Sequence, residues 1–90
     1  MEILLDVSDL EPCEPLERSL EAAGRLAEGD YLRVLHRREP RMLFPLLEQQ
    51  GFAWEVRPKG PADYAIYIWR RDDRLAREFV HQALDADQAC

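Results

Sequence analysis

Long apolar runs are missing from this sequence. No stretch of its 90 residues approaches the roughly 20 consecutive apolar residues of a membrane-spanning helix, so we expect no contact with a membrane. The first residues, from Met1 to Asp6, also lack the basic region of a secretory signal. A cytoplasmic location is the expectation that follows.

Cysteine and histidine are scarce. The two cysteines, Cys13 and Cys90, lie far apart, and the chain has no CxxC or Cys/His spacing typical of a zinc site. One potential disulfide does not make the cross-linked scaffold of a small secreted protein. Phosphate-binding glycine loops and the G-x-S-x-G and HExxH motifs are absent as well. We therefore expect no metal, no cofactor and none of these enzymatic activities.

Basic residues are outnumbered. The chain has 12 lysines and arginines against 18 acids, a net charge of −6. A nucleic-acid binder needs a basic face to displace counterions from phosphates, so we expect no nucleic-acid partner. The charge is unevenly spread, however, because residues 1–30 carry nine acids and two arginines, whereas residues 31–41 carry four arginines and one glutamate. A site for anions is therefore sought in the second segment.

What the sequence does contain is clear periodicity within one small domain. Alternating apolar residues favour strands over residues 2–7, 31–36, 52–57 and 64–69. Apolar stripes at helical spacing predict helices that begin near Pro15, near Met42 and after a cap at Asp73. Gly29 and Gly51 are expected to end the first two helices, and residues 58–61 to form a turn.

This order of elements predicts an α/β (α+β) two-layer sandwich. Two β-α-β units require right-handed crossovers, which place both helices on one face of the sheet when the strands are neighbours. We therefore expect a βαβαββ fold with a four-stranded mixed sheet and two helices on one face, plus an added C-terminal helix.

The strand over residues 64–69 has apolar side chains on both of its faces. An apolar sheet face does not stay exposed, so either the third helix folds back over it or a partner covers it. We favour the helix, because it is tethered close by. The alternative is a homodimer through the open sheet face or through the C-terminal helix.

Cys13 lies at the mouth of the first predicted helix, between Pro12 and Pro15. The positive end of a helix dipole favours the thiolate, the reactive form of cysteine. Nearby negative charge opposes this effect, and Glu11 and Glu14 are close in sequence. Cys13 is thus either a reactive thiol or a bystander between two turn-making prolines.

The run LDVSDLEPCEPL, from Leu5 to Leu16, resembles the opening of the TusA/SirA-like proteins. In that superfamily a strand ends in Leu-Asp, and a loop leads to a C-P-x-P motif at the start of a helix. Here the order is Pro12-Cys13, which resembles an uncharacterised branch that often has a proline pair in place of Cys-Pro. The stretches LRVLH (32–36), EPR (39–41), PLLE (45–48) and GFAWE (51–55) support that branch.

The resemblance covers about residues 3–70 and implies a βαβαββ fold. It makes residues 1–71 a TusA-like domain and residues 72–90 a helical extension of it. In the superfamily the motif cysteine carries sulfur as a persulfide between proteins, which would make Cys13 the catalytic residue. Moving the thiol by one residue in an extended loop turns it by up to about 180°, so its role does not transfer directly.

A second cluster surrounds the start of the second predicted helix, with His36, Arg38 and Arg41 as candidate ligand-binding residues. Guanidinium groups beside a helix N-terminus suit an anion. The alternative is that these arginines only balance Glu39 and the acidic first helix. His36 alternates with Leu32 and Val34, so we expect it to face the helices.

These observations favour a small cytoplasmic accessory or protein-interaction domain without catalysis of its own, linked to sulfur or redox metabolism. The expected partner is a protein, either a sulfur donor or acceptor or a redox protein. One alternative is a sulfur carrier that uses Cys13, a sulfurtransferase-type relay. The other is a domain that binds a small anion or ligand through His36, Arg38 and Arg41.

Overall fold

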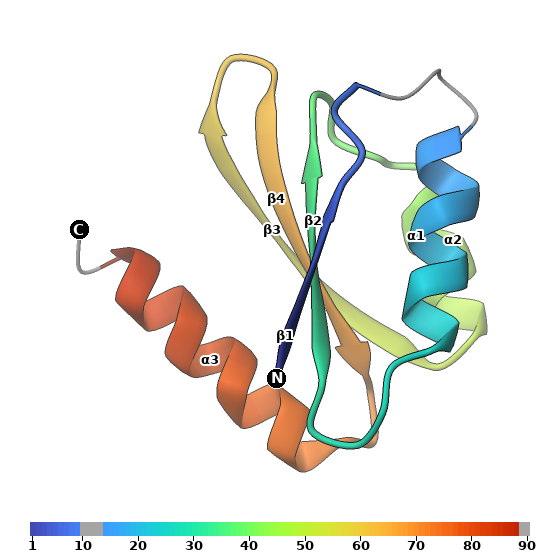
Figure 1. Cartoon of the computed structure of the whole chain (residues 1–90), viewed down its shortest axis with the longest axis vertical. Coiled ribbons are helices and arrows are strands. Elements are labelled where there is room, and N and C mark those ends of the chain that lie inside the picture. The colour runs from blue at the N-terminus through green and yellow to red at the C-terminus, as the bar shows by residue number, and fades with distance from the viewer. Residues whose placement is uncertain (10–13, 89–90) are drawn as a thin grey trace.

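The computed structural model describes residues 1–9 and 14–88 (Figure 1). These residues form four strands and three helices, in the order that the periodicity predicts. The elements are β1 (Glu2–Asp6), α1 (Glu14–Gly24), β2 (Tyr31–His36), α2 (Leu43–Gln49), β3 (Phe52–Gly60), β4 (Asp63–Arg70) and α3 (Arg74–Gln88).

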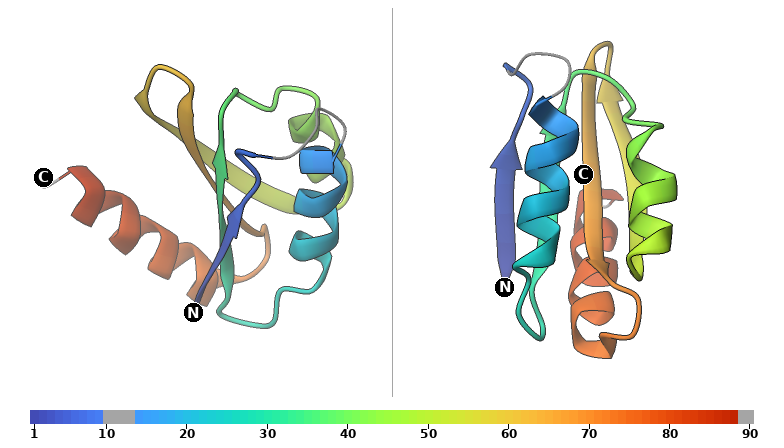
Figure 2. Two further views of the ribbon diagram at one scale, coloured as in Figure 1. Left: turned by 45° about the horizontal axis from the view of Figure 1, so that its top comes forward. Right: turned by 90° about the vertical axis from the view of Figure 1, so that its right-hand side faces the viewer.

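The four strands make one mixed sheet in the order β1-β2-β4-β3. Strands β1 and β2 are parallel, whereas β4 is antiparallel to both β2 and β3. Helices α1 and α2 follow β1 and β2 and lie on the same face of the sheet, as right-handed crossovers require (Figure 2). The predicted fold class is confirmed.

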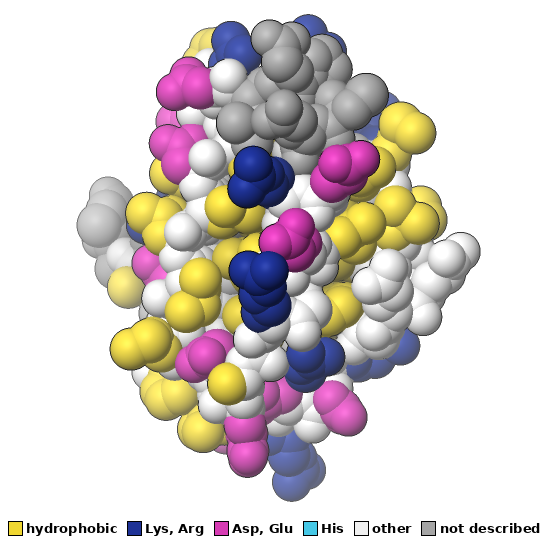
Figure 3. Space-filling view, turned by 45° about the vertical axis from the view of Figure 1, so that its right-hand side comes forward, with side chains coloured by type: hydrophobic (Ala, Val, Ile, Leu, Met, Phe, Trp, Pro, Cys, Tyr) yellow, Lys and Arg dark blue, Asp and Glu magenta, His cyan; other side chains and the backbone are white. Residues whose placement is uncertain are grey.

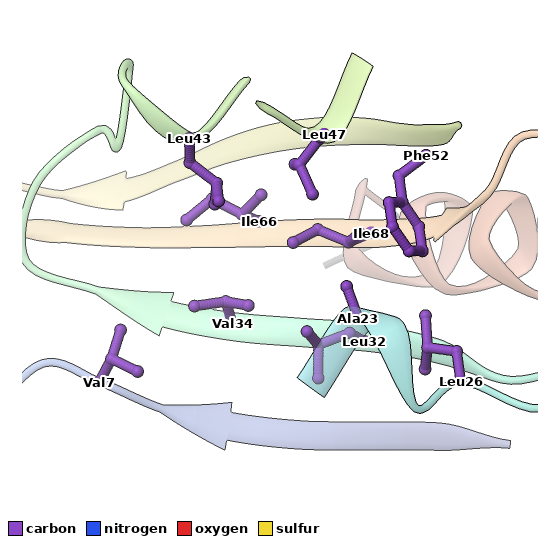
Figure 4. Close-up of a cluster of buried hydrophobic side chains, with 10 residues drawn as sticks. All are labelled: Val7, Ala23, Leu26, Leu32, Val34, Leu43, Leu47, Phe52, Ile66 and Ile68. Atoms are coloured by element: carbon purple, nitrogen blue, oxygen red, sulfur yellow. The ribbon is translucent and has the colours of Figure 1, made fainter. Parts of the chain in front are cut away.

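The main core lies between the sheet and these two helices (Figure 4). The two central strands supply alternate side chains, so that one face of each strand is apolar toward α1 and α2. Helix α2 supplies Leu43 and Leu47 to this core. The fully buried side chains of the strands are Leu32, Val34, Ile66 and Ile68, each 0% exposed.

Helix α3 covers the opposite face of the sheet, as the doubly apolar strand predicts (Figure 1). One row of its side chains, at spacings of four residues, packs against aromatic residues of β2 and β4. Ala76 and Val80 in this row are 0% exposed, and Tyr67 beneath them is 2% exposed. The second core consists of Tyr31, Ala65, Tyr67, Trp69, Ala76, Val80 and Leu84.

Asp73 fixes the start of α3, as the sequence predicts. Its Oδ1 accepts a hydrogen bond from the N–H of Ala76 at 3.0 Å, which is the geometry of a helix cap. Its Oδ2 accepts another from the N–H of Gly29 at 2.8 Å, in the loop before β2. The backbone hydrogen bonds from Ala76 and Gly29 lower the pKa of this carboxyl group. One side chain thus joins α3 to the loop that leads into the sheet.

Helix α1 ends earlier than predicted. It stops at Gly24, whereas the apolar stripe and Gly29 predict an end near residue 28. The guanidinium of Arg70 explains the early end, because it donates hydrogen bonds to the carbonyl oxygens of Gly24 (3.0 Å) and Leu26 (3.2 Å). Ala27 is therefore exposed, and Gly29 adopts a positive φ of 85° in the loop.

The predicted turn over residues 58–61 is wrong in its extent. Strand β3 continues through Pro58 to Gly60, and the turn falls on Pro61 and Ala62. A proline fits there because β3 is an edge strand, where a missing N–H need not remove a ladder bond. Pro45 is likewise tolerated, because it is the third residue of α2 and the first turn of a helix has unpaired N–H groups.

Candidate functional site

The parallel strands β1 and β2 end side by side. Asp6 pairs with Leu35, and the N–H of Val7 donates to the carbonyl of Leu35 at 2.9 Å. Helix α1 also begins at this end of the sheet (Figure 1). Carboxyl ends of parallel strands are common positions for ligand sites. The topology thus brings the start of α1 and the segment from His36 to Arg41 to one end of the molecule.

Cys13, the predicted catalytic residue, lies outside the described residues, as does Cys90. The described chain before it ends in a tight polar turn. Both the N–H and the Oγ of Ser8 donate to Oδ1 of Asp6, at 3.0 and 2.6 Å. These hydrogen bonds, with the side-chain bond as the larger cause, lower the pKa of Asp6. Asp6 therefore stays ionised at the end of β1.

His36 faces α1 and α2, on the same side of β2 as Leu32 and Val34, and is half-buried. Its Nδ1 accepts a hydrogen bond from the N–H of Arg38 at 3.0 Å. Burial lowers its pKa, and the charges of Arg38 and Arg37 lower it further. The imidazole is thus held neutral as a hydrogen-bond acceptor.

The side chains of Arg38 and Arg41 are exposed to solvent. Arg41 forms an ion pair with Glu39, with 3.3 Å between its Nε and Oε2 of the glutamate. This pair fits the charge-balance interpretation for Arg41. The N–H groups of Arg41 and Leu43 also donate to the carbonyls of Glu39 and Pro40, both at 2.9 Å, so neither is free for an anion. Ligand binding by His36, Arg38 and Arg41 stays a prediction.

The environment of His36 leads to a prediction about pH. We expect the pKa of His36 to lie below the ordinary value of about 6.5. Arg38→Gln should raise this pKa, because the charge of Arg38 opposes protonation of the imidazole. A histidine with a lowered pKa contributes stability that is present above pH 6.5 and lost as the pH falls through the lowered value. An NMR titration with His36→Asn to assign the signal measures this. A midpoint at or above the ordinary value contradicts the burial and charge described here.

The second candidate surface is the outer edge of β1, which, among residues 1–9 and 14–88, pairs with β2 alone. The carbonyl of Met1 accepts from the N–H of Tyr31, and the N–H of Val7 donates to Leu35, so odd-numbered residues bond toward β2. Backbone groups alternate in direction along a strand. The N–H and C=O groups of Glu2, Leu4 and Asp6 therefore point away from the sheet and are open to another strand.

A groove of about 440 Å³ lies between the start of β1 and α3. Met1 and Phe79 line it and remain 76% and 38% exposed, and Leu4, which is 53% exposed, lies on the same face of β1 as Glu2. In Figure 3, which is turned toward the side of α1 and α2, apolar side chains lie on both sides of a row of charged ones. The residues that line the groove are Met1, Glu2, Tyr31, Phe79, Gln82 and Ala83.

The polar side of this groove is fixed by Glu2. Its Oε1 accepts a hydrogen bond from the hydroxyl of Tyr31 at 2.9 Å, and its Oε2 lies 3.5 Å from Nε of Arg33. Burial, followed by the hydrogen bond to Glu2, raises the pKa of Tyr31 to about 12. The phenol therefore remains a neutral donor and holds the carboxylate at the rim.

The sequence alone does not predict this surface. The sheet order that leaves β1 at an edge depends on the position of β4, which periodicity alone does not give. One signal was available in α3, where two neighbouring apolar rows run along the helix. The row of Ala76, Val80 and Leu84 is buried, whereas Leu75 and Phe79 of the other row are exposed. A second row beyond what one sheet face buries indicates a further contact.

Two other classes of site find no support in residues 1–9 and 14–88. No cluster of three or more His, Cys, Asp or Glu side chains there is arranged to hold a metal ion. No helix in this part of the chain is long and apolar enough to cross a membrane.

Comparison with known proteins places the chain in a family. No curated protein and no solved structure matches it significantly. A family of conserved sequences matches residues 4–70, which run from β1 to the last residue of β4 and leave out α3. The chain belongs to this family, described as Uncharacterized conserved protein (DUF2249).

Proposed function

We propose that this domain is a cytoplasmic protein-interaction module that holds its partner on the β1–α3 surface. This surface consists of the free edge of β1 and the residues Met1, Glu2, Leu4, Phe79, Gln82 and Ala83. The observation that carries the proposal is the exposure of Leu4, Phe79 and Met1 beside an unpaired strand edge. Exposed apolar side chains next to a groove are typical of protein contacts.

The two edges of the sheet differ in a way that supports this proposal. Natural edge strands are commonly protected from pairing by proline, lysine or a bulge. Strand β3 has Pro58 and Lys59 and an irregular register between Pro58 and Gly60. Strand β1 has none of these features, since its sequence is EILLD. The absence of proline, lysine and a bulge from β1 fits a partner that pairs with this edge.

The nature of the partner follows from the resemblance of the Leu5–Leu16 run to TusA/SirA-like proteins. Members of that superfamily pass sulfur between proteins. We therefore propose a partner from sulfur or redox metabolism, either a sulfur donor or acceptor or a redox protein. In this proposal the domain positions its partner and does not itself catalyse a reaction.

A photo-crosslinking experiment with purified follow-up tests the interaction. A photoreactive amino acid at position 4 or 79 is expected to capture a protein that the same group at position 42 does not, although Met42 is 79% exposed. The captured protein is then purified and its affinity for the chain measured. We expect Leu4→Glu to weaken binding at least about tenfold and Met42→Glu to leave it unchanged. Equal capture at all three positions, or binding insensitive to Leu4→Glu, contradicts the proposal.

Sulfur transfer by Cys13 is a second candidate, favoured by its sequence position directly before Glu14, the first residue of α1. The Cys13 thiolate would attack the outer sulfur of a donor persulfide. The donor's S–S bond breaks, its thiolate leaves, and Cys13 becomes a persulfide. After incubation with a cysteine desulfurase and cysteine, intact mass should rise by one sulfur atom in Cys90→Ser but not in Cys13→Ser. No gain in either variant contradicts this candidate.

Anion binding by His36, Arg38 and Arg41 is the third hypothesis. Amide chemical shifts of residues 36–42 should then move when phosphate or sulfate is added. Unchanged shifts in this segment argue against it.

A further inference from the structure

We infer that the partner contributes an extended segment that pairs with β1 as a fifth strand, and that this segment carries basic residues on either side of an apolar one. The inference rests on the proposed function, because it specifies the chemistry of the partner that the β1–α3 surface binds. It is carried by the direction of the backbone groups and the pattern of charge along β1.

The backbone of β1 offers a continuous set of hydrogen-bonding groups. Glu2, Leu4 and Asp6 each direct an N–H and a C=O away from β2, since the groups of the odd-numbered residues bond toward it. An added strand satisfies such groups in the mode by which many domains bind extended peptides. Five residues of β1 are enough to pair with a short segment.

The side chains of Glu2, Leu4 and Asp6 indicate which residue types the added strand carries. Glu2, Leu4 and Asp6 lie on the face of the sheet that α3 partly covers and read acidic–apolar–acidic. Opposite charges in directly facing positions of neighbouring strands stabilise the pair, and like charges destabilise it. A segment with Lys or Arg opposite both acids and an apolar residue opposite Leu4 is therefore complementary.

The other face of β1 adds a second requirement. Ile3 is 37% exposed, and Leu5 beside it is half-buried against the main core. Residues of the added strand on this face therefore lie next to apolar side chains. Together the two faces specify a segment of the form basic–apolar–apolar–apolar–basic.

A second copy of this chain does not meet these requirements. Antiparallel pairing of two β1 strands with full overlap places Glu2 opposite Asp6 of the other copy at both ends. Parallel pairing through this edge turns the second strand over, so its odd-numbered apolar residues stand opposite Glu2 and Asp6. The first arrangement therefore faces like charges and neither supplies a basic residue opposite the acids, while each copy carries a net charge of −6. The same pattern that attracts a basic segment thus opposes self-association through this edge.

Peptide binding to the full chain tests the inference. One peptide contains Lys-Val-Leu-Val-Lys and the other Glu-Val-Leu-Val-Glu, both within identical Gly/Ser flanks. We expect the basic peptide to bind at least about tenfold more tightly in an amide chemical-shift titration, with the largest shifts in β1. Its binding should weaken as salt is raised, because exposed charges are screened.

Two further variants separate strand pairing from simple charge attraction. Leu4→Pro removes an outward N–H that makes no bond to β2, whereas Leu4→Ala keeps it. We expect the first to weaken binding at least about tenfold and the second to weaken it less. A peptide with N-methyl groups on its central leucine and on the valine after it gives the same test without altering the protein, should Leu4→Pro fail to fold, because one of the two N–H groups points to β1 in either strand direction.

The results of these experiments distinguish failure of this inference from failure of the proposed function. Equal binding of the two peptides, binding unaffected by N-methylation, or shifts that avoid β1 overturn the inference. A stable dimer that Leu4→Pro dissociates overturns it as well, because the occupant is then a second copy. If a captured partner depends on Leu4 and Phe79 while the basic peptide does not bind, the proposed function stands and this inference fails.

Discussion

Replacing Val80 by Asp is expected to lower the free energy of unfolding by about 4 kcal/mol or more, enough to unfold most molecules of a small domain. Val80 is 0% exposed and lies in the core between α3 and the sheet. The substitution puts a carboxylate among apolar and aromatic side chains, where the burial of a charge is costly. Urea denaturation followed by tryptophan fluorescence measures the change, and Trp69 lies in the same core.

The neighbouring residue provides a control for this substitution. His81 is exposed on α3, so His81→Asp should change stability by no more than about 0.5 kcal/mol. If Val80→Asp is equally mild, α3 does not cover the sheet in solution. A chain truncated after Asp72 gives a matching result, since it uncovers Tyr31, Tyr67 and Trp69 and should self-associate in size-exclusion chromatography.

Replacing Arg70 by Ala is expected to cost about 2 kcal/mol of stability. The Arg70 guanidinium donates to the carbonyls of Leu26 at 3.2 Å and Gly24 at 3.0 Å, which the end of α1 leaves without helical partners. It also lies 5.3 Å from the centre of the Phe52 ring, a cation–π distance. The substitution therefore removes three contacts that join α1, β3 and β4.

Hydrogen exchange locates the effect of Arg70→Ala. Amides in the last turn of α1 should exchange faster in the variant, while amides of α3 should exchange faster only as far as the loss of global stability requires. Arg74→Ala is the matched control, because Arg74 is an exposed arginine only four residues away. If both variants have the same stability, the hydrogen bonds of Arg70 do not hold the end of α1.

The central elements of the fold were predictable because the spacing of their apolar residues shows which side of each element is buried. Strand β4 alternates two apolar sets, so it had to lie between two layers, and α3 supplies the layer that α1 and α2 do not. Asp73 before a clean helical stripe located the start of α3 to the residue. In these cases local sequence and tertiary packing favour the same structure.

Two boundaries were predicted wrongly, the end of α1 and the start of the turn after β3. Both depend on contacts with residues that are distant in sequence. Arg70 accounts for the end of α1, although it lies 44 residues from Leu26. Pro58 belongs to a strand because β3 is at an edge, and edge position depends on the whole sheet. Neither partner is visible in a local pattern, so propensity alone gave a longer helix and a longer turn.

In the candidate sites, too, local features were predictable from the sequence and features that depend on the tertiary structure were not. The structure puts His36 on the predicted face and pairs Arg41 with Glu39, both of which follow from local alternation and charge. The β1–α3 surface combines residues from the two ends of the chain, Met1 and Phe79 among them. Such a surface appears only when the sheet order is known. In the sequence, the β1–α3 surface is indicated by the second apolar row of α3, to which Leu75 and Phe79 belong.

The most direct test of the β1 edge is the exchange rate of two neighbouring amides, measured with and without the basic peptide. Leu5 bonds toward β2, so its amide should exchange slowly in both states, whereas the outward amide of Leu4 should exchange rapidly in the free chain. We predict that bound peptide slows the Leu4 amide at least about tenfold and leaves Leu5 unchanged. A Leu4 amide that stays fast in the bound state, or is already slow in the free chain, contradicts the account.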